Sequence, residues 1–166
     1  VRLGKSLIVL RITAIALLMI ALARPQAILD NSKATSEGVD IVLDIDTSTS
    51  MLAEDFLLGS RRINRFDLVR EVVKDFIRKR KDDRIGMVAF AARAYTVCPL
   101  TTDYAWLNEN LDRVRVGMIE DATAIGSAIA SSINRLKNSK TKSKIIIMLT
   151  DGVSNAGNIS PVVAAE

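Results

Sequence analysis

The sequence lacks histidine altogether and contains a single cysteine, Cys98. Without histidine the chain cannot form a Ser-His-Asp triad, a Cys-His catalytic pair or a zinc site that uses imidazole. One cysteine can form neither an internal disulfide nor a four-cysteine metal site, and we interpret Cys98 as a small buried apolar residue. These absences exclude the common histidine- and thiol-based classes of catalysis and metal binding.

The chain also lacks an excess of basic residues along most of its length. The net charge of +4 is accounted for by four residues of the first segment: Arg2, Lys5, Arg11 and Arg24. Residues 25–166 carry 19 basic and 19 acidic side chains, so binding to nucleic acid has little support. The basic run at 78–81 is followed at once by Asp82 and Asp83 and closes a predicted helix. We interpret it as a solvated helix end and not as a phosphate-binding patch.

The length of 166 residues, 49% of them hydrophobic, fits one domain with an appendage. The chain begins with Val1, and its last residues resemble the first turn of a helix that Ser160 caps and Pro161 starts. We therefore expect a fragment with sequence missing at both ends.

Residues 7–23 form a 17-residue apolar run that only Arg11 and Thr13 interrupt. This length is at the short limit of a membrane span, and the competing interpretation is a cleaved signal peptide. No convincing small-residue cleavage site follows the run, so we predict a transmembrane helix with its flank at 1–24 and a linker at 25–38. Three of the four basic residues precede the core of the span, which places the first residue inside the cell and the domain outside.

The remaining chain, 39–166, alternates strand-like and helix-like segments, which predicts a doubly wound α/β domain with a mainly parallel sheet flanked by helices. Strands are expected at 39–45, 85–90, 95–100 and 145–149, and helices at 67–80, 103–114 and 125–136. The strand at 95–100 is expected to be a short antiparallel edge. The continuous apolar character of 145–149 predicts a strand covered on both faces.

Two of these strands each end in a carboxylate. Asp46, Ser48 and Ser50 follow the first strand, and Asp151 follows the last. Because parallel strands direct their carboxyl ends to one crevice, these oxygens can converge on a hard cation such as Mg²⁺, and Thr123 at a helix start can add a hydroxyl. The alternative interpretation is that Asp, Ser and Thr serve only as turn and cap residues, with Thr123 capping the helix at 125–136.

The residues Asp46-x-Ser48-x-Ser50, Thr123 and Asp151 resemble the metal-ion-dependent adhesion site of von Willebrand factor A domains. The motifs at 51–56, 83–90 and 98–103 resemble the bacterial BatA type of the aerotolerance operon. The resemblance covers 38–166 and implies that the domain is C-terminally incomplete. The resemblance makes Asp46, Ser48, Ser50, Thr123 and Asp151 the expected metal ligands, with Mg²⁺ as the expected ion and Mn²⁺ or Ca²⁺ as alternatives.

The chain departs from the pattern of this family at three positions. Thr49 and Ala122 stand where the family usually has glycine, and Ser127 where it usually has aspartate. None of the three changes removes a ligand, but a β-branched Thr49 suits positive φ poorly. Asp44 lies inside the first strand, where it either supports the site or pairs with an arginine; the sequence leaves both possibilities open.

The resemblance implies a membrane-anchored, metal-dependent protein-binding module and not an enzyme. Its expected ligand is a protein that offers an acidic side chain, and its expected partners are a MoxR-type AAA+ ATPase and other Bat proteins in envelope stress tolerance. The expected location is the bacterial inner membrane with the soluble domain in the periplasm. One alternative is a Mg²⁺-dependent phosphatase of the haloacid dehalogenase type, with Asp44 as nucleophile and Asp46 as general acid/base. A metal-free structural domain is the other.

Overall fold

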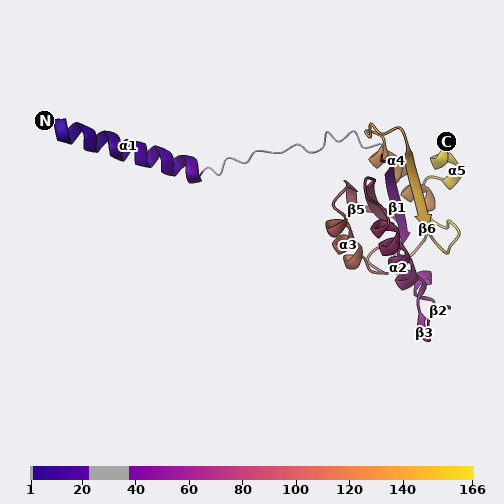
Figure 1. Cartoon of the computed structure of the whole chain (residues 1–166). Helices are drawn as coiled ribbons and strands as arrows, with labels where there is room; N and C mark the ends of the chain where they lie inside the picture. The colour runs from indigo at the N-terminus through magenta and orange to yellow at the C-terminus, as the bar shows by residue number, and fades with distance from the viewer. Residues whose placement is uncertain (1, 23–37) are drawn as a thin grey trace. The chain divides into compact units, whose positions relative to one another are not determined.

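The computed structural model describes residues 2–22 and 38–166, which belong to two separate units, Val1–Thr35 and Ser36–Glu166. Helix α1 (Arg2–Leu22) forms the described part of the first unit, and the α/β domain forms the second (Figure 1). The predicted linker at 25–38 lies outside the described residues except for Gly38.

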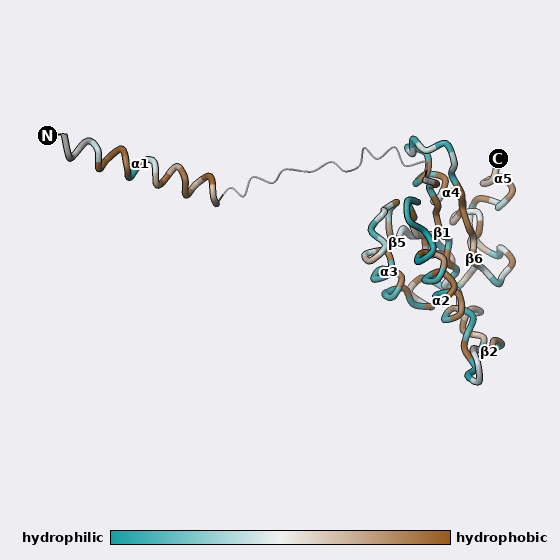
Figure 2. Tube along the Cα trace, in the orientation of Figure 1, coloured by the Kyte–Doolittle hydropathy of each residue, from teal (hydrophilic) through white to brown (hydrophobic). Residues whose placement is uncertain are grey.

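Helix α1 is mostly apolar from Leu7 to Leu22, with Arg11 as its charged interruption (Figure 2). Four consecutive residues, Leu7, Ile8, Val9 and Leu10, are all more than half exposed. The hydroxyl of Thr13 donates to the carbonyl of Val9 at 2.8 Å, so this polar group is satisfied inside the helix. Among the described residues, none of the helices combines the length and the apolar character that crossing a membrane requires.

The domain is built on a four-stranded sheet with the order β5-β4-β1-β6. Its strands are β1 (Asp40–Asp46), β4 (Arg84–Phe90), β5 (Ala94–Thr101) and β6 (Lys144–Leu149). β1 runs parallel to both β4 and β6, whereas β5 is antiparallel to β4. The predicted mainly parallel sheet with an antiparallel edge at 95–100 is therefore confirmed, and β1 and β6 end side by side.

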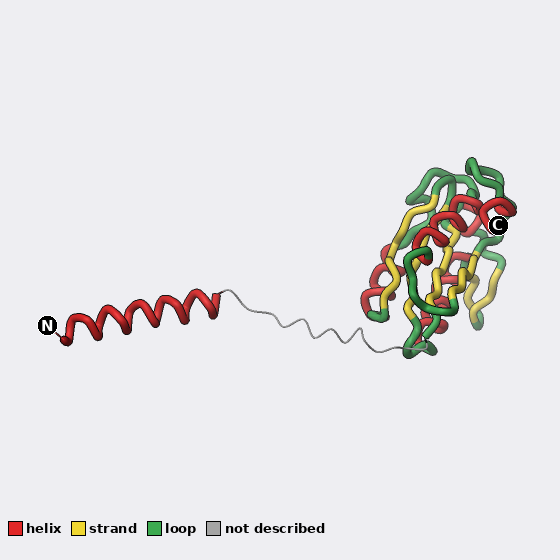
Figure 3. The backbone as a smooth tube through the Cα atoms, turned by 90° about the horizontal axis from the view of Figure 1, so that it is seen from above, coloured by secondary structure: helices red, strands yellow, loops and turns green. Residues whose placement is uncertain are grey.

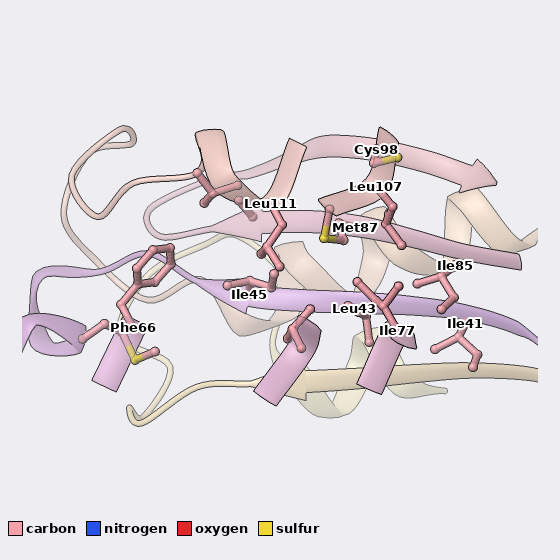
Figure 4. Close-up of a cluster of buried hydrophobic side chains, with 14 residues drawn as sticks. Ile41, Leu43, Ile45, Phe66, Ile77, Ile85, Met87, Cys98, Leu107 and Leu111 are labelled. Atoms are coloured by element: carbon pink, nitrogen blue, oxygen red, sulfur yellow. The ribbon is translucent and has the colours of Figure 1, made fainter. Parts of the chain in front are cut away.

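Helices cover both faces of this sheet (Figure 3). They are α2 (Arg65–Arg78), α3 (Tyr104–Arg113), α4 (Ile125–Leu136) and the short α5 (Pro161–Ala165). On one face Ile41, Leu43 and Ile45 of β1 pack with Ile77 of α2 and Leu107 of α3 (Figure 4). On the other face the alternate β1 residue Val42 packs with Leu136 of α4, and α5 lies against α4. This strict alternation along β1 fixes which face each of its side chains meets.

Strand β6 is less buried than its apolar sequence predicts. Ile145 is 44% exposed, and the other residues of the strand are only partly buried or exposed. Within the described residues β6 is the outer strand and pairs only with β1, so neighbouring strands and helices shield it less than β1. The expectation that this strand is covered on both faces was therefore wrong at its amino end.

A short antiparallel hairpin between the first strand and α2 was not predicted from the sequence. After the 3₁₀ helix η2 (Thr49–Leu52), strand β2 (Phe56–Leu58) turns at Gly59, whose φ is +62°, into β3 (Arg61–Ile63). The hairpin projects from the end of the domain at which β1 and β6 terminate (Figure 1). The Arg65 amide donates to the Ala53 carbonyl at 3.1 Å and closes the base of the hairpin.

Two smaller predictions from the sequence are confirmed. Arg78 and Lys79 both form ion pairs with Asp75 at the end of α2, as expected of a solvated helix end. Cys98 is only 1% exposed, and burial raises the pKa of its thiol to about 11, so the thiol stays protonated at neutral pH.

Candidate metal site at the ends of β1 and β6

Asp46 is the last residue of β1, and its carboxylate joins the two strand ends. Oδ1 accepts a hydrogen bond of 2.8 Å from the Ser48 amide, and Oδ2 accepts one of 2.6 Å from the Thr150 hydroxyl, just beyond β6. Thr47 holds the same turn to β4, because its amide donates to the Phe90 carbonyl at 2.8 Å. Asp46 has no exposed surface, and these backbone and hydroxyl groups hold its carboxylate in place.

The two serines of the turn line up with Asp151. The Ser48 and Ser50 hydroxyl oxygens lie 2.9 Å apart, and the Ser50 hydroxyl donates to Oδ1 of Asp151 at 2.8 Å. The Asp151 side chain is only 13% exposed, although the residue as a whole is exposed through its backbone. Oxygens from two segments that are far apart in the sequence thus form a continuous row.

Thr49, between these serines, adopts an ordinary helical backbone as the first residue of η2. The loop therefore needs no positive φ at this position. The Thr49 amide and hydroxyl donate to the two oxygens of Asp121 at 2.8 Å and 2.6 Å. The hydroxyl and amide of Thr49 hold the pKa of Asp121 below its usual value. Thr49 adds a side-chain hydrogen bond that glycine could not make.

Thr123 also lines the site and is held in place by Asn155. Its amide donates to Oδ1 of Asn155 at 2.7 Å, and its carbonyl accepts from the Asn155 amide at 3.0 Å. A methyl group built on Gly152 would lie 3.5 Å from the Thr123 hydroxyl oxygen, which places that oxygen beside the residue after Asp151. The N-cap of α4 is Ala124, without a side-chain cap hydrogen bond, so Thr123 does not cap this helix as the alternative interpretation supposed.

An open depression of about 450 Å³ lies between these groups. Its lining consists of Ser48, Thr49, Ser50, Asp121, Ala122, Thr123 and Asn155. Three of the five predicted site residues thus face one cavity, and the other two, Asp46 and Asp151, are hydrogen-bonded to the turn that carries Ser48 and Ser50.

Arg65 brings a positive charge to this site, which sequence reasoning missed. The Nε atom of Arg65 lies 3.1 Å from Oδ1 and 2.9 Å from Oδ2 of Asp55. Its Nη2 atom also contacts Oδ2 of Asp55. Its Nη1 forms an ion pair with Oδ2 of Asp151. Arg65 starts α2, where Asn64 is the N-cap, so helix geometry positions its backbone. No sequence signal marked this pairing, because 86 residues separate Arg65 from Asp151.

Asp44 faces α4 and is not among the residues that line the depression. It has no exposed surface, and its Oδ1 accepts a hydrogen bond from the Ser132 hydroxyl of α4. Its Oδ2 has no hydrogen-bond partner among the described residues. Burial raises the pKa of Asp44 to about 7, and the Ser132 hydrogen bond only partly offsets that rise. Asp44 therefore pairs with a serine and not with an arginine.

The oxygen set suits a hard divalent ion better than a transition metal. In the described residues no three carboxylate or thiol side chains are grouped closely enough to hold a metal, so hydroxyls must supply part of any coordination shell. Adjacent ligands of an octahedral Mg²⁺ ion, with bonds of about 2.0–2.1 Å, lie about 2.8–3.0 Å apart. The Ser48–Ser50 and Ser50–Asp151 oxygen separations of 2.9 Å and 2.8 Å fall in this range, which is also that of ordinary hydroxyl hydrogen bonds.

The sequence matches the family model described as the von Willebrand factor type A domain over residues 41–154. The chain belongs to this family. This von Willebrand factor A domain places its Asp-x-Ser-x-Ser turn, Thr123 and Asp151 at one end of the sheet. Domains of the family generally act as adhesion or interaction modules, which agrees with the class of function expected from the sequence.

The proteins similar to this chain include an aerotolerance-related membrane protein. An uncharacterized protein from Borreliella burgdorferi is 36% identical over 146 residues, which are 88% of this chain and 42% of the relative's length. An aerotolerance-related membrane protein from Bacteroides fragilis has a similar structure, with a TM-score of 0.64 and 28% identity over 72% of this chain and 57% of its own. The conserved hypothetical protein BatB from Bacteroides thetaiotaomicron has a TM-score of 0.60 and 26% identity, over 69% of this chain and 57% of its own.

Proposed function

We propose that this domain is a protein-binding module whose affinity depends on a divalent metal ion held by Asp46, Ser48, Ser50, Thr123 and Asp151. The observation that carries the proposal is the row of oxygens from Asp46 through Ser48 and Ser50 to Asp151, beside a depression that Thr123 also lines. Mg²⁺ is the proposed ion because all these donors are hard oxygens, and Mn²⁺ or Ca²⁺ are alternatives.

The residues around the proposed ion have distinct roles. Ser48, Ser50 and Thr123 line the open depression. Asp46 is locked by the Ser48 amide and the Thr150 hydroxyl, so its carboxylate is oriented before any ion arrives. When bound, the metal supplies a Lewis-acidic centre. The neutral hydroxyls of Ser48, Ser50 and Thr123 would leave most of the charge of that centre available to a carboxylate from a partner protein.

The proposed partner is therefore a protein that offers an acidic side chain. The resemblance to BatA-type proteins adds a MoxR-type AAA+ ATPase and sister Bat proteins as candidates, in envelope stress tolerance. We extend the proposal to attachment at the bacterial inner membrane through the segment 1–24, with the domain in the periplasm. The mostly apolar sequence of α1 and the membrane protein among the similar structures support this extension.

The phosphatase alternative is not favoured by the position of its key residue. That mechanism requires Asp44 to attack a phosphate, but Asp44 has no exposed surface and its carboxylate points toward Ser132 of α4. A nucleophile needs access to its substrate, whereas this carboxylate lies on the far side of β1 from the core that α2 and α3 share.

Thermal melting of the chain with increasing Mg²⁺ or Mn²⁺ tests the proposed site. An ion that binds only the folded chain stabilises it by about 2.7 kcal/mol at a concentration 100 times its Kd, which raises the Tm measurably. We expect this gain to vanish in Asp46→Ala and Asp151→Ala. The matched control is Asp112→Ala, because Asp112 is an exposed carboxylate that pairs with Lys74 elsewhere on the domain. Equal Tm values with and without metal in the wild-type chain would refute the site.

A binding experiment tests the partner class. The immobilised chain is exposed to a purified MoxR-type ATPase or Bat protein with Mg²⁺ and then with EDTA. We expect association with Mg²⁺ that EDTA reverses, and loss of association in Ser48→Ala. Association that is equally strong in EDTA would show that the interaction does not use a metal.

A further inference from the structure

Arg65 is the feature of this site that the proposed function does not use. Its guanidinium group carries a fixed positive charge at every physiological pH and contacts Asp151, one of the proposed metal ligands. A divalent ion and a guanidinium group are both attracted to the same carboxylate. The presence of both within one site therefore has to affect the binding of the ion.

The two oxygens of Asp151 are divided between the two sides of the site. Oδ1 accepts from Ser50, on the side of the hydroxyl row, and Oδ2 contacts Nη1 of Arg65. The Asp151 side chain is 13% exposed, so water screens this contact less than it screens a surface ion pair. Part of the negative charge that Asp151 could offer to a metal is already compensated by Arg65.

Asp55 holds the guanidinium group in place. It binds Nε and Nη2, which leaves Nη1 directed to Asp151. The hydrogen bonds from Arg65 keep the pKa of Asp55 below its usual range, so Asp55 remains charged at neutral pH. The backbone bond from the Arg65 amide to the Ala53 carbonyl fixes the position from which the side chain extends. Arg65 is therefore a tethered cation with a defined direction.

We propose that Arg65 is an internal counter-cation of the metal site: it neutralises Asp151 in the metal-free protein and competes with a divalent ion for that carboxylate. Arg65 thus lowers the metal affinity of the site. This inference rests on the proposed function, since it concerns the affinity of the same site. It assigns to Arg65 the role of tuning occupancy by the ion and not of coordinating it.

Titration of the full chain with Mn²⁺ alone, followed by isothermal calorimetry and by the electron paramagnetic resonance of free Mn²⁺, measures this effect. Removal of one positive charge near the ion in a partly screened site is expected to tighten binding by roughly 3- to 10-fold in Arg65→Gln. Arg65→Lys keeps the charge and should stay close to the wild type. The difference between Arg65→Gln and the wild type should shrink as NaCl is raised from 50 to roughly 500 mM.

Two further variants separate competition from a structural role. Arg78→Gln also removes an arginine that pairs with an aspartate, but this arginine is exposed and lies at the other end of α2, so the change should leave Mn²⁺ affinity unchanged. Asp55→Asn keeps an amide oxygen that can still accept from Arg65 but removes the negative charge that partly compensates the guanidinium group, so it should weaken Mn²⁺ binding, which is the opposite sign to Arg65→Gln. Asp55→Asn also gives a result if Arg65→Gln fails to fold.

The outcomes distinguish this inference from the function on which it rests. If the wild-type chain binds no Mn²⁺, the proposed metal site is refuted, and the proposed role of Arg65 is refuted with it. If the wild type binds Mn²⁺ but Arg65→Gln binds it equally or more weakly, the metal site stands and the competition is refuted.

Discussion

The hydroxyl of Ser50 donates a hydrogen bond of 2.8 Å to Oδ1 of Asp151, across 101 residues of sequence. This bond joins the turn after β1 to the end of β6, at the point where the proposed metal ligands meet. It therefore belongs to the folded domain alone, since no local segment can form it. The bond also makes Ser50 a position at which stability and metal binding can be measured separately.

Ser50→Ala removes this hydroxyl and one proposed ligand. In the absence of metal we expect a loss of about 1 kcal/mol in the free energy of unfolding, the usual contribution of one such hydrogen bond. With saturating Mg²⁺ the loss should be larger, because the metal-dependent part of the stability also disappears. Urea unfolding with EDTA and with Mg²⁺ measures both quantities. The control Ser131→Ala, in α4, should give the same change under the two conditions.

Asp44→Asn tests the role of the buried carboxyl group that β1 directs toward α4. Burial raises the pKa of Asp44 to about 7, so between about pH 4 and 7 the folded chain keeps a proton that the unfolded chain releases. This group therefore makes the free energy of unfolding fall as pH rises through that window. Asparagine cannot titrate, and its amide oxygen can still accept from Ser132.

The expected result for Asp44→Asn is a stability relative to wild type that grows from pH 5 to pH 8 by roughly 3 kcal/mol, because about two pKa units of the window lie between pH 5 and the folded-state pKa of about 7. Chemical unfolding in EDTA across this range measures it. Parallel pH profiles of the two proteins would contradict the assignment of a protonated Asp44. The exposed replacement Asp112→Asn serves as the control for a generic change of charge.

Thr49→Val changes a hydroxyl into a methyl group of similar shape next to the proposed site. The Thr49 hydroxyl and amide lower the pKa of Asp121, so loss of the hydroxyl should raise that pKa toward its ordinary value. NMR titration of the Asp121 carboxyl carbon measures this pKa directly. Thr49→Ser, which retains the hydroxyl, should leave the pKa low, and an unchanged pKa in Thr49→Val would mean that the amide alone is responsible.

Gly126→Ala tests how the segment before α5 is held on α4. A methyl group on Gly126 would lie 2.0 Å from the backbone carbonyl oxygen of Ile159, a contact that backbone must move to relieve. We expect a loss of about 1–3 kcal/mol, the usual cost of overpacking, and faster hydrogen exchange in residues 159–165. Gly152→Ala meets only ordinary van der Waals contacts and should be nearly neutral for stability in EDTA.

Most of the fold was predictable because its elements have strong hydrophobic patterns. Strands β1 and β4 are apolar runs that lie in the middle of the sheet, and α4 repeats apolar residues on one face. The hairpin β2–β3 was missed since each strand has three residues, too few to show a period of two. The exposure of Ile145 was missed for a different reason: an apolar run indicates a strand but not how many neighbours cover it.

For the site residues, the sequence predicted only which strand end or helix start carries each of them. The sequence indicated that Asp46, Ser48, Ser50 and Asp151 would be near one another because parallel strands end on one side of a sheet. Contacts that depend on side-chain reach could not be derived this way. Arg65 meets Asp151, and Asn155 holds Thr123, through tertiary geometry that no spacing in the sequence encodes. The partner of Asp44 was undecided for the same reason.

The distance in sequence between Asp46 and its partner Thr150 has a consequence for the nascent chain. During synthesis β1 emerges from the ribosome about a hundred residues before β6, and the hydrogen bond between Asp46 and Thr150 forms only after β6 has paired with β1. A partly synthesised chain thus carries the first turn without the second carboxylate. Under the proposed function, a growing polypeptide cannot capture an ion or engage a partner until its last described strand is in place.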